Sequence, residues 1–319
     1  MATQAEVRAA RLAELPFETS VNAGPRNAGN RHVGGFFTSV KEIVSHRELL
    51  DLLIRRELKS RYKDSSLGFV WSLIKPLVQL LIYYVFIGQV LGAARGVPDF
   101  AIFVFAGLTL WGLYSETIAT GTASIVSNGG LIKKVYLPRE IFPLAATGSA
   151  VFNFLVQMVV LLAAILVLGQ FPISLNLLYV PAAVAIVLIW GVAFAVLLSA
   201  LNVYLRDIQY LVEVVMLLLF WASPIVYSWS FVVTAVKQHT WLLEVYLLNP
   251  ISLGILAFQR GLWQAGSQTR VIEGNTVQPV DWPVYMDYRL IGAAIVGLIV
   301  LFIAQRIFSR LQGNFAQEI

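Results

Sequence analysis

The sequence contains no cysteine, which excludes disulfide bonds, thiol nucleophiles and cysteine-ligated metals. Its three histidines, His32, His46 and His239, are scattered, and no Asp-x-Asp pair is present. Metal-dependent hydrolysis and glycosyl transfer therefore lack obvious residues. No Gly-x-x-x-x-Gly-Lys-Ser/Thr phosphate loop occurs, so this chain is not expected to hydrolyse ATP alone.

Charged residues are also scarce, at 13% of 319 positions, whereas 58% of the residues are hydrophobic. Such a chain has too little polar surface to cover a soluble globule of this size. The lipid bilayer is therefore expected to supply most of its surroundings. Residues 1–20 are charged and have no apolar core, so no cleaved secretory signal is predicted there.

The sequence is rich in long apolar blocks. Each is close to or longer than the ~20 residues needed to cross a ~30 Å hydrocarbon core. They predict an all-α polytopic membrane protein with a transmembrane region at 67–310. The six predicted spans are 67–91, 101–127, 141–169, 178–201, 210–227 and 290–307.

Lys and Arg are distributed unevenly among the connections between these blocks. Seventeen lie before the first span or on one alternating set of connections, against four or five on the other set. Positive residues near the ends of spans are retained in the cytoplasm. The sequence therefore predicts a multi-pass protein of the cytoplasmic (inner) cell membrane with both termini in the cytoplasm.

The regions that flank the spans have their own patterns. Residues 1–35 are polar and Gly-rich without helical or strand period, which predicts a flexible cytoplasmic tail. Residues 36–66 predict an amphipathic cytoplasmic helix, suited both to an anionic membrane surface and to packing on the base of the bundle. Residues 311–319 are expected to form a cytoplasmic C-terminal tail.

The last outer connection contains a second apolar region, 231–264, which Asn249-Pro250 divides. Proline removes a backbone donor and disfavours helix at the residue before it. Two re-entrant half-helices are preferred to a seventh span, because they keep an even number of crossings and leave Arg306 and Arg310 inside.

Three charged residues fall within the predicted spans: Lys75, Glu116 and Glu213. An ionised group near the bilayer centre costs roughly 2.5–3.5 kcal/mol on insertion scales, so such groups usually face protein or water. Lys75 is expected to extend toward the interface rather than to contact a substrate. Glu116 has Ser and Thr neighbours, which fit either packing between helices or the lining of a path.

Aromatic residues on the first span and around the fifth exceed what one interfacial belt requires. Aromatic faces pack well against sugar rings and leave a moving chain free to slide. A sugar path, and a lipid-interface belt with core packing, both remain open. The candidate glycan contacts are Phe69, Trp71, Tyr83, Tyr84, Trp221, Tyr227 and Trp229.

Three motifs carry a resemblance to a known family. They are Arg56-Glu-Leu-Lys-Ser-Arg-Tyr-Lys-Asp-Ser-Ser-Leu-Gly-Phe-Val-Trp-Ser-Leu-Ile-Lys-Pro-Leu77, Leu131-Ile-Lys-Lys-Val-Tyr-Leu-Pro-Arg-Glu-Ile141 and Leu201-Asn-Val-Tyr-Leu-Arg-Asp-Ile208. In this order, over about residues 40–310, they resemble the polysaccharide-exporting permeases of type-2 ABC transporters. The chain looks most like the permeases for O-antigen, teichoic acid and actinobacterial cell-wall galactan.

The resemblance implies a homodimer bound to two copies of a separate ABC ATPase, which binds the ATP and Mg; no cofactor is expected in this chain. It implies export of a lipid-linked polysaccharide through a channel lined by the first and fifth spans. A type-2 ABC efflux permease for drugs or lipids and a membrane-embedded glycan-modifying enzyme are the alternatives.

The resemblance also assigns two segments. Residues 46–63 would be the interface helix, with Arg55, Arg56, Lys59, Arg61 and Lys63. Residues 128–140 would seat on the ATPase as the coupling segment, with a short helix between Gly130 and Pro138 and with the contact residues Asn128, Leu131, Lys133, Lys134, Pro138, Arg139 and Glu140.

Overall fold

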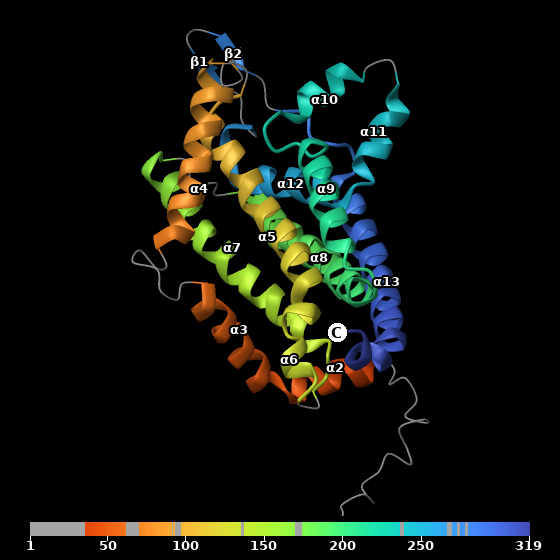
Figure 1. Cartoon of the computed structure of the whole chain (residues 1–319). Coiled ribbons are helices and arrows are strands. Elements are labelled where there is room, and N and C mark those ends of the chain that lie inside the picture. Colours follow the sequence, from red (N-terminus) through yellow and green to blue (C-terminus); the bar gives the residue numbers. More distant parts are fainter. Residues whose placement is uncertain are drawn as a thin grey trace, which may run out of the picture.

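The computed structural model describes residues 36–61, 70–90, 92, 97–134, 137–169, 174–236, 239–266, 270–272, 275–277 and 280–319. The predicted tail 1–35 and two predicted site residues, Lys63 and Phe69, lie outside these ranges. The described elements are helices except for one short antiparallel hairpin, β1 (Arg270–Ile272) with β2 (Asn275–Val277). This confirms the predicted all-α polytopic class (Figure 1).

The centre of the bundle is α5 (Phe100–Ser127), which packs against α7 (Ile141–Val167) and α8 (Tyr179–Tyr204). On its other side α8 packs against α13 (Met286–Leu311), where Trp190 Nε1 donates to the Ala293 carbonyl at 3.0 Å. Small residues allow α5 and α8 to approach closely. A Cβ added to Gly121 of α5 would lie 2.5 Å from the Cβ of Ala195 on α8.

Among the described residues, five helical segments are long and apolar enough to cross a membrane, or six if one sharply bent helix pair counts as a span. The first segment joins α4 (Trp71–Ile82) to a π-helix, η3 (Tyr83–Val90). The 3₁₀ helix η5 (Leu175–Leu178) leads into α8.

The predicted span 210–227 corresponds to a shorter helix, α9 (Ile208–Trp221). Its 14 residues give a length of about 21 Å at 1.5 Å per residue. The chain then turns at Ala222–Ser228, because Pro224 lacks an N–H and disfavours helix at the residue before it. The predicted helical span was therefore too long at its C-terminal end.

After α10 (Trp229–Ala235), the bent pair is α11 (Thr240–Leu247) and α12 (Pro250–Leu262), which meet at 88°. The bend falls at Asn249-Pro250, where the Asn249 side chain accepts from the Ile251 N–H at 3.2 Å and caps α12. Within α12 only Pro250 and Arg260 are not buried. The 3₁₀ turn η6 (Gln264–Gly266) follows.

The lower end in Figure 1 gathers α2 (Phe36–Ser45), α3 (Arg47–Arg61), α6 (Gly129–Ile132), the 3₁₀ turn η7 (Gln312–Asn314) and α14 (Phe315–Glu318). An apolar cluster separate from the main core joins α3, α6 and α14 to the ends of α5, α7, α8 and α13, while α2 contacts α3 and α13. Residues 311–319, expected as a tail, are therefore folded, and Phe315 is fully buried.

The contact between α5 and α8 can be tested with Gly121→Ala. The added methyl meets Ala195, so we expect a loss of roughly 1–3 kcal/mol, the usual range for overpacking. Gly292→Ala on α13 is the matched control, because no atom lies within 4 Å of its added Cβ. Thermal unfolding in detergent measures both; equal stabilities for the two variants would contradict this packing.

Candidate functional site

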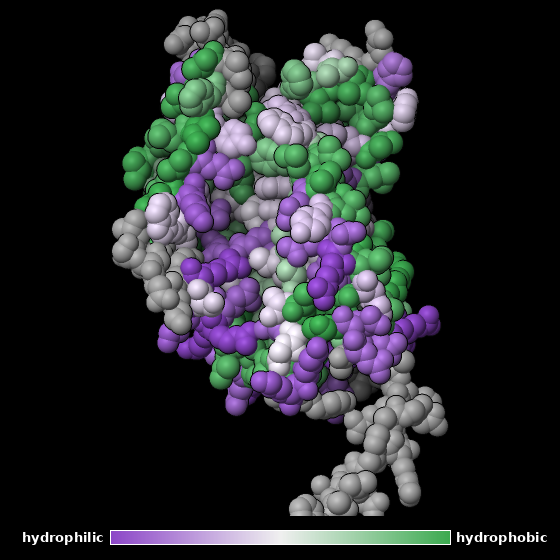
Figure 2. All heavy atoms as spheres, viewed as in Figure 1, coloured by the Kyte–Doolittle hydropathy of each residue, from purple (hydrophilic) through white to green (hydrophobic). Residues whose placement is uncertain are grey.

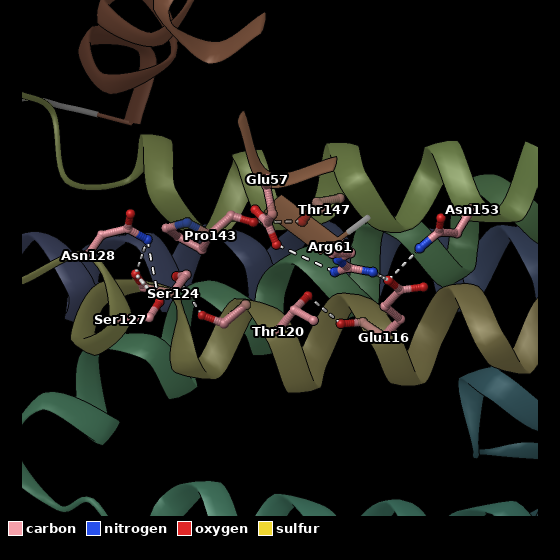
Figure 3. Close-up of polar contacts among 11 residues, drawn as sticks. Glu57, Arg61, Glu116, Thr120, Ser124, Ser127, Asn128, Pro143, Thr147 and Asn153 are labelled. Atoms are coloured by element: carbon pink, nitrogen blue, oxygen red, sulfur yellow. Dashed lines mark hydrogen bonds and ion pairs between the residues drawn. The ribbon is translucent and has the colours of Figure 1, made fainter. Parts of the chain in front are cut away.

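One face of α5 is polar at every fourth residue from Glu116 through Thr120 and Ser124, and continues to Asn128 at the helix end. Residues four apart lie on the same face of a helix. Thr120 Oγ1 donates to the Glu116 carbonyl at 2.6 Å, and Asn128 Nδ2 donates to the Ser124 carbonyl at 2.8 Å. The Thr120 hydroxyl and the Asn128 amide therefore find acceptors within their own helix (Figure 3).

The upper cavity, of about 760 Å³, lies between α4, α5, α7 and the C-terminal end of α3. Figure 2 shows hydrophilic side chains gathered in a hollow between α4 and α9. Most of the cavity's polar groups are neutral donors and acceptors, which suit a hydroxyl-rich ligand. Its polar lining consists of Arg61, Ser72, Lys75, Gln79, Ser115, Glu116, Asn153 and Gln157, beside Trp71 and Trp111.

The lower cavity, of about 480 Å³, lies below it, between α3, α5 and α6. It is lined by Arg56, Glu57 and Ser60 of α3, by the lower half of the polar face of α5, and by Gly130 and Leu131. The polar face therefore runs from the upper cavity to the first turn of α6.

An ion pair lies between the two cavities. Arg61 of α3 donates to the Glu116 carboxylate, to which Asn153 Nδ2 of α7 also donates at 2.7 Å, and Arg61 lies 3.4 Å from Glu57 (Figure 3). Burial acts to lower the pKa of the Arg61 guanidinium, but the hydrogen bond and charge of Glu116 outweigh burial and leave that pKa above its ordinary value. Arg61 therefore stays charged, and it joins α3 to α5.

The predicted interface helix corresponds to α3, which packs on α7. Leu53 is buried, and the Ile54 side chain lies against Gly148. Arg56 donates to the Asn128 side-chain oxygen, which joins α3 to the start of the predicted coupling segment. Arg55 and Lys59 face outward, with Arg55 paired to Asp51 at 2.7 Å. Packing on the base of the bundle, one of the two expected and compatible arrangements, is therefore present.

Within the predicted coupling segment, α6 is a single four-residue turn, shorter than the helix predicted between Gly130 and Pro138. Lys133 and Lys134 are exposed, whereas Asn128, Leu131, Pro138 and Arg139 are half-buried; residues 135 and 136 lie outside the described ranges. Glu140 is only 5% exposed and accepts hydrogen bonds from Gln305 Nε2 at 3.2 Å and Ser309 Oγ at 3.3 Å. Its carboxylate therefore points into the bundle.

The predicted aromatic contacts fall into three environments. Exposed rings belong to Trp71, Tyr84 and Trp221, and of these Trp71 lines the upper cavity. Tyr83 packs against Phe220 at a centroid distance of 6.3 Å, and Tyr227 donates to the Trp221 carbonyl at 3.0 Å, so both are half-buried. Trp229 is 5% exposed and packs against Tyr246, and thus contributes to the core.

Sequence reasoning missed three amides of the upper cavity, Gln79, Asn153 and Gln157. Asn153 and Gln157 are four residues apart in the apolar sequence of α7, a spacing that puts both on one face. Such amides are typical of helix contacts and polar paths within membranes, and this was the available signal. Lys75 also lines this cavity.

The spans and the continuous polar face define a multi-pass membrane protein of the transporter type. The comparison is specific: residues 48–263 match the ABC-2 type transporter family, and the chain belongs to this family. The predicted membership of the type-2 ABC permeases is thereby confirmed. A membrane subunit of this family is a transport subunit without a catalytic site of its own.

The chain is 27% identical over 286 residues to the O-antigen export system permease protein RfbA of Myxococcus xanthus, covering 88% of this chain and 98% of the relative. It is 27% identical over 272 residues to the RfbA protein of Klebsiella pneumoniae, covering 85% and 94%. A shorter match, 30% identical over 84 residues, relates 26% of the chain to 32% of the polysialic acid transport protein KpsM of Escherichia coli.

The coupling between Arg61 and Glu116 can be measured with a double-mutant cycle. We expect Arg61→Gln to lower stability by roughly 1.5–3 kcal/mol, because it leaves a half-buried carboxylate without its charged donor. In the Glu116→Gln background the same change should cost much less. Arg55→Gln, which breaks an exposed pair within one helix, should change stability by less than about 0.5 kcal/mol. Thermal unfolding of the purified chain gives all terms, and additive effects of Arg61→Gln and Glu116→Gln would contradict the pair.

Proposed function

We propose that this chain is the membrane subunit of an ATP-driven ABC exporter that moves a lipid-linked polysaccharide from the cytoplasm to the outer side of the cytoplasmic membrane. Two copies of the chain would bind two copies of a separate ABC ATPase, which would hold the ATP and Mg. Both termini would be cytoplasmic. The motifs imply O-antigen, teichoic acid or actinobacterial cell-wall galactan as the exported glycan.

The observation that carries this proposal is the polar face of α5, in a chain of the ABC-2 family whose relatives are named for O-antigen and polysialic acid transport. The face borders two cavities rich in neutral hydrogen-bonding groups. Sugars offer many hydroxyls that both donate and accept, so Gln79, Asn153 and Gln157 suit them. Arg61 and Lys75 add positive charge, which suits a phosphate linkage between glycan and lipid.

The surfaces of α4 and α9 support the proposed homodimer. Both helices carry exposed apolar side chains, including Val78 and Leu81 of α4 and Leu217 and Leu218 of α9. Figure 1 places α4 and α9 on either side of the α5 face. A second copy facing this one would enclose the hollow between them and convert it into a path with protein on both sides.

The contacts also give the proposal a mechanism. ATP-driven movement of the partner would displace α6, which directly follows α5 and Asn128. Arg56 would pass that displacement to α3, and the pair of Arg61 with Glu116 would pass it to the wall of the upper cavity. Because α3 also packs along α7, it would move as a rigid lever and change the width of the path.

We expect the chain, purified from its native membrane in mild detergent, to bring with it a protein that contains a Walker A loop, in equal amounts. Reversing charge in Lys133→Glu/Lys134→Glu should weaken this capture roughly tenfold, the effect of about 1.4 kcal/mol. Arg310→Glu, a charge reversal at the same end of the bundle, should leave capture unchanged. Mass spectrometry of the purified material is the measurement. A folded chain that reproducibly brings no ATPase would refute the proposal.

The exposed rings are tested by Tyr84→Ala and Trp221→Ala, with Tyr288→Ala on α13 as an exposed aromatic control. Loss of about 1 kcal/mol of ring stacking, the scale of an aromatic pair, corresponds to a roughly fivefold lower export rate. Lipid-linked glycan accumulated on the cytoplasmic side reports the defect and identifies the cargo, while ATPase capture should stay normal. Full export by both variants would remove these rings from the path, and accumulation of a drug or a glycan-free lipid would favour a different cargo.

A further inference from the structure

The segment that follows α13 is packed between the bundle and the predicted coupling segment (Figure 1). Phe315 of α14 is fully buried, and its ring meets Phe308 of α13 edge-on at a centroid distance of 5.5 Å. It also meets Tyr204 at the end of α8 at 6.1 Å. The Tyr204 hydroxyl donates to the Leu311 carbonyl at 2.7 Å. These contacts fix residues 311–315 to two spans.

Phe315 also contacts the C-terminal half of the coupling segment. The Arg139 guanidinium lies 5.6 Å from the centre of the Phe315 ring, within the range of a cation–π interaction. The adjacent Glu140 accepts from Gln305 and Ser309 of α13. Residues 139 and 140 are thus held by the end of α13 and by α14.

Ile319 reaches the other half of the coupling segment. A Cβ built on Gly129, the first residue of α6, would lie 2.2 Å from Ile319 Cγ2. Only glycine leaves room for Ile319 at this position. The neighbouring Gly130 is exposed, and its added Cβ would meet no atom within 4 Å. Phe315 and Ile319 therefore support the two halves of one segment.

A helix as short as α6 depends on such support. An isolated single turn is unstable in water, because nucleation fixes several residues for one hydrogen bond. The buried side of α6 is Gly129 and Ile132, and its outward side continues into the exposed Lys133 and Lys134. The position of those two lysines is therefore set by what packs under Gly129 and Ile132.

We propose that Phe315 and Ile319, together called the C-terminal wedge, are positioning residues that set the height and orientation of the coupling segment for its ATPase partner. The role of the partner rests on the proposed function, whereas the positioning itself can be measured in the purified chain alone. The wedge links the same segment to α8 and α13, on the side of the bundle opposite to the contact of α3 with Asn128.

The first test uses the absence of cysteine, which allows two spin labels to be placed at Lys133→Cys and Arg55→Cys without removing any native thiol. The labelled chain is diluted with unlabelled chain, so that only distances within one copy are recorded. We expect a narrow distance distribution that broadens with Phe315→Ala and is restored with Phe315→Leu. Gly313→Ala, whose added Cβ meets no atom within 4 Å, should keep it narrow. An unchanged distribution in Phe315→Ala would overturn the wedge.

The second test adds a methyl group at Gly129 and then removes the Ile319 side chain that it would meet. It remains informative even if Phe315→Ala does not fold. Gly129→Ala should displace Ile319, shift the label distance and reduce ATPase capture, and Gly129→Ala/Ile319→Ala should restore both. Failure of the double variant to restore the label distance would overturn the wedge. A wild-type chain that captures no ATPase, with the label distances behaving as expected, would refute the proposed function and leave the wedge supported.

Discussion

The structure depends on one constraint: polar groups must be satisfied where water is scarce. Helix α5 meets it by having Thr120, Ser124 and Asn128 donate to carbonyls of their own helix. Glu116 cannot be satisfied in this way, because a carboxylate only accepts, and it takes donors from Arg61 and Asn153 on two other elements. The hydrogen-bonding requirement of the Glu116 carboxylate therefore helps to fix the position of α3 against the bundle.

The second requirement in a bilayer is close packing between the helices. Lipid tails are as apolar as the side chains they replace, so burial alone does not drive helices together in a bilayer. Contacts between small residues, such as Gly121 with Ala195, bring α5 and α8 close enough for dispersion to hold them. The same centre buries most of α12, whose Gln259 donates to the Pro224 carbonyl at 3.0 Å and thereby holds the turn after α9.

The sequence was sufficient for the features that hydropathy and local chemistry determine. Apolar run length predicted the polytopic helical class, and Asn249-Pro250 predicted the break between α11 and α12, because a cap and a missing donor act within a few residues. The early end of α9 at Trp221 was missed, although Pro224 was its signal. The partners of Glu116 could not be read from spacing, since Arg61 and Asn153 are 55 and 37 positions away in the chain. The same holds for the contact of Phe315 with Tyr204, which is 111 positions away.

Two long-range contacts connect the predicted coupling segment, residues 128–140, to the membrane-spanning bundle. Asn128, at the start of the predicted coupling segment, accepts a hydrogen bond from Arg56 of α3, and Arg139, near its end, lies over the Phe315 ring, which packs against α8 and α13. The segment is thus connected to two separate parts of the bundle. A displacement of α6 against only one of them would strain the other, so the two connections favour movement of the whole lower end together. Because Arg61 of α3 borders the upper cavity and donates to Glu116, such a movement would extend to the polar face of α5.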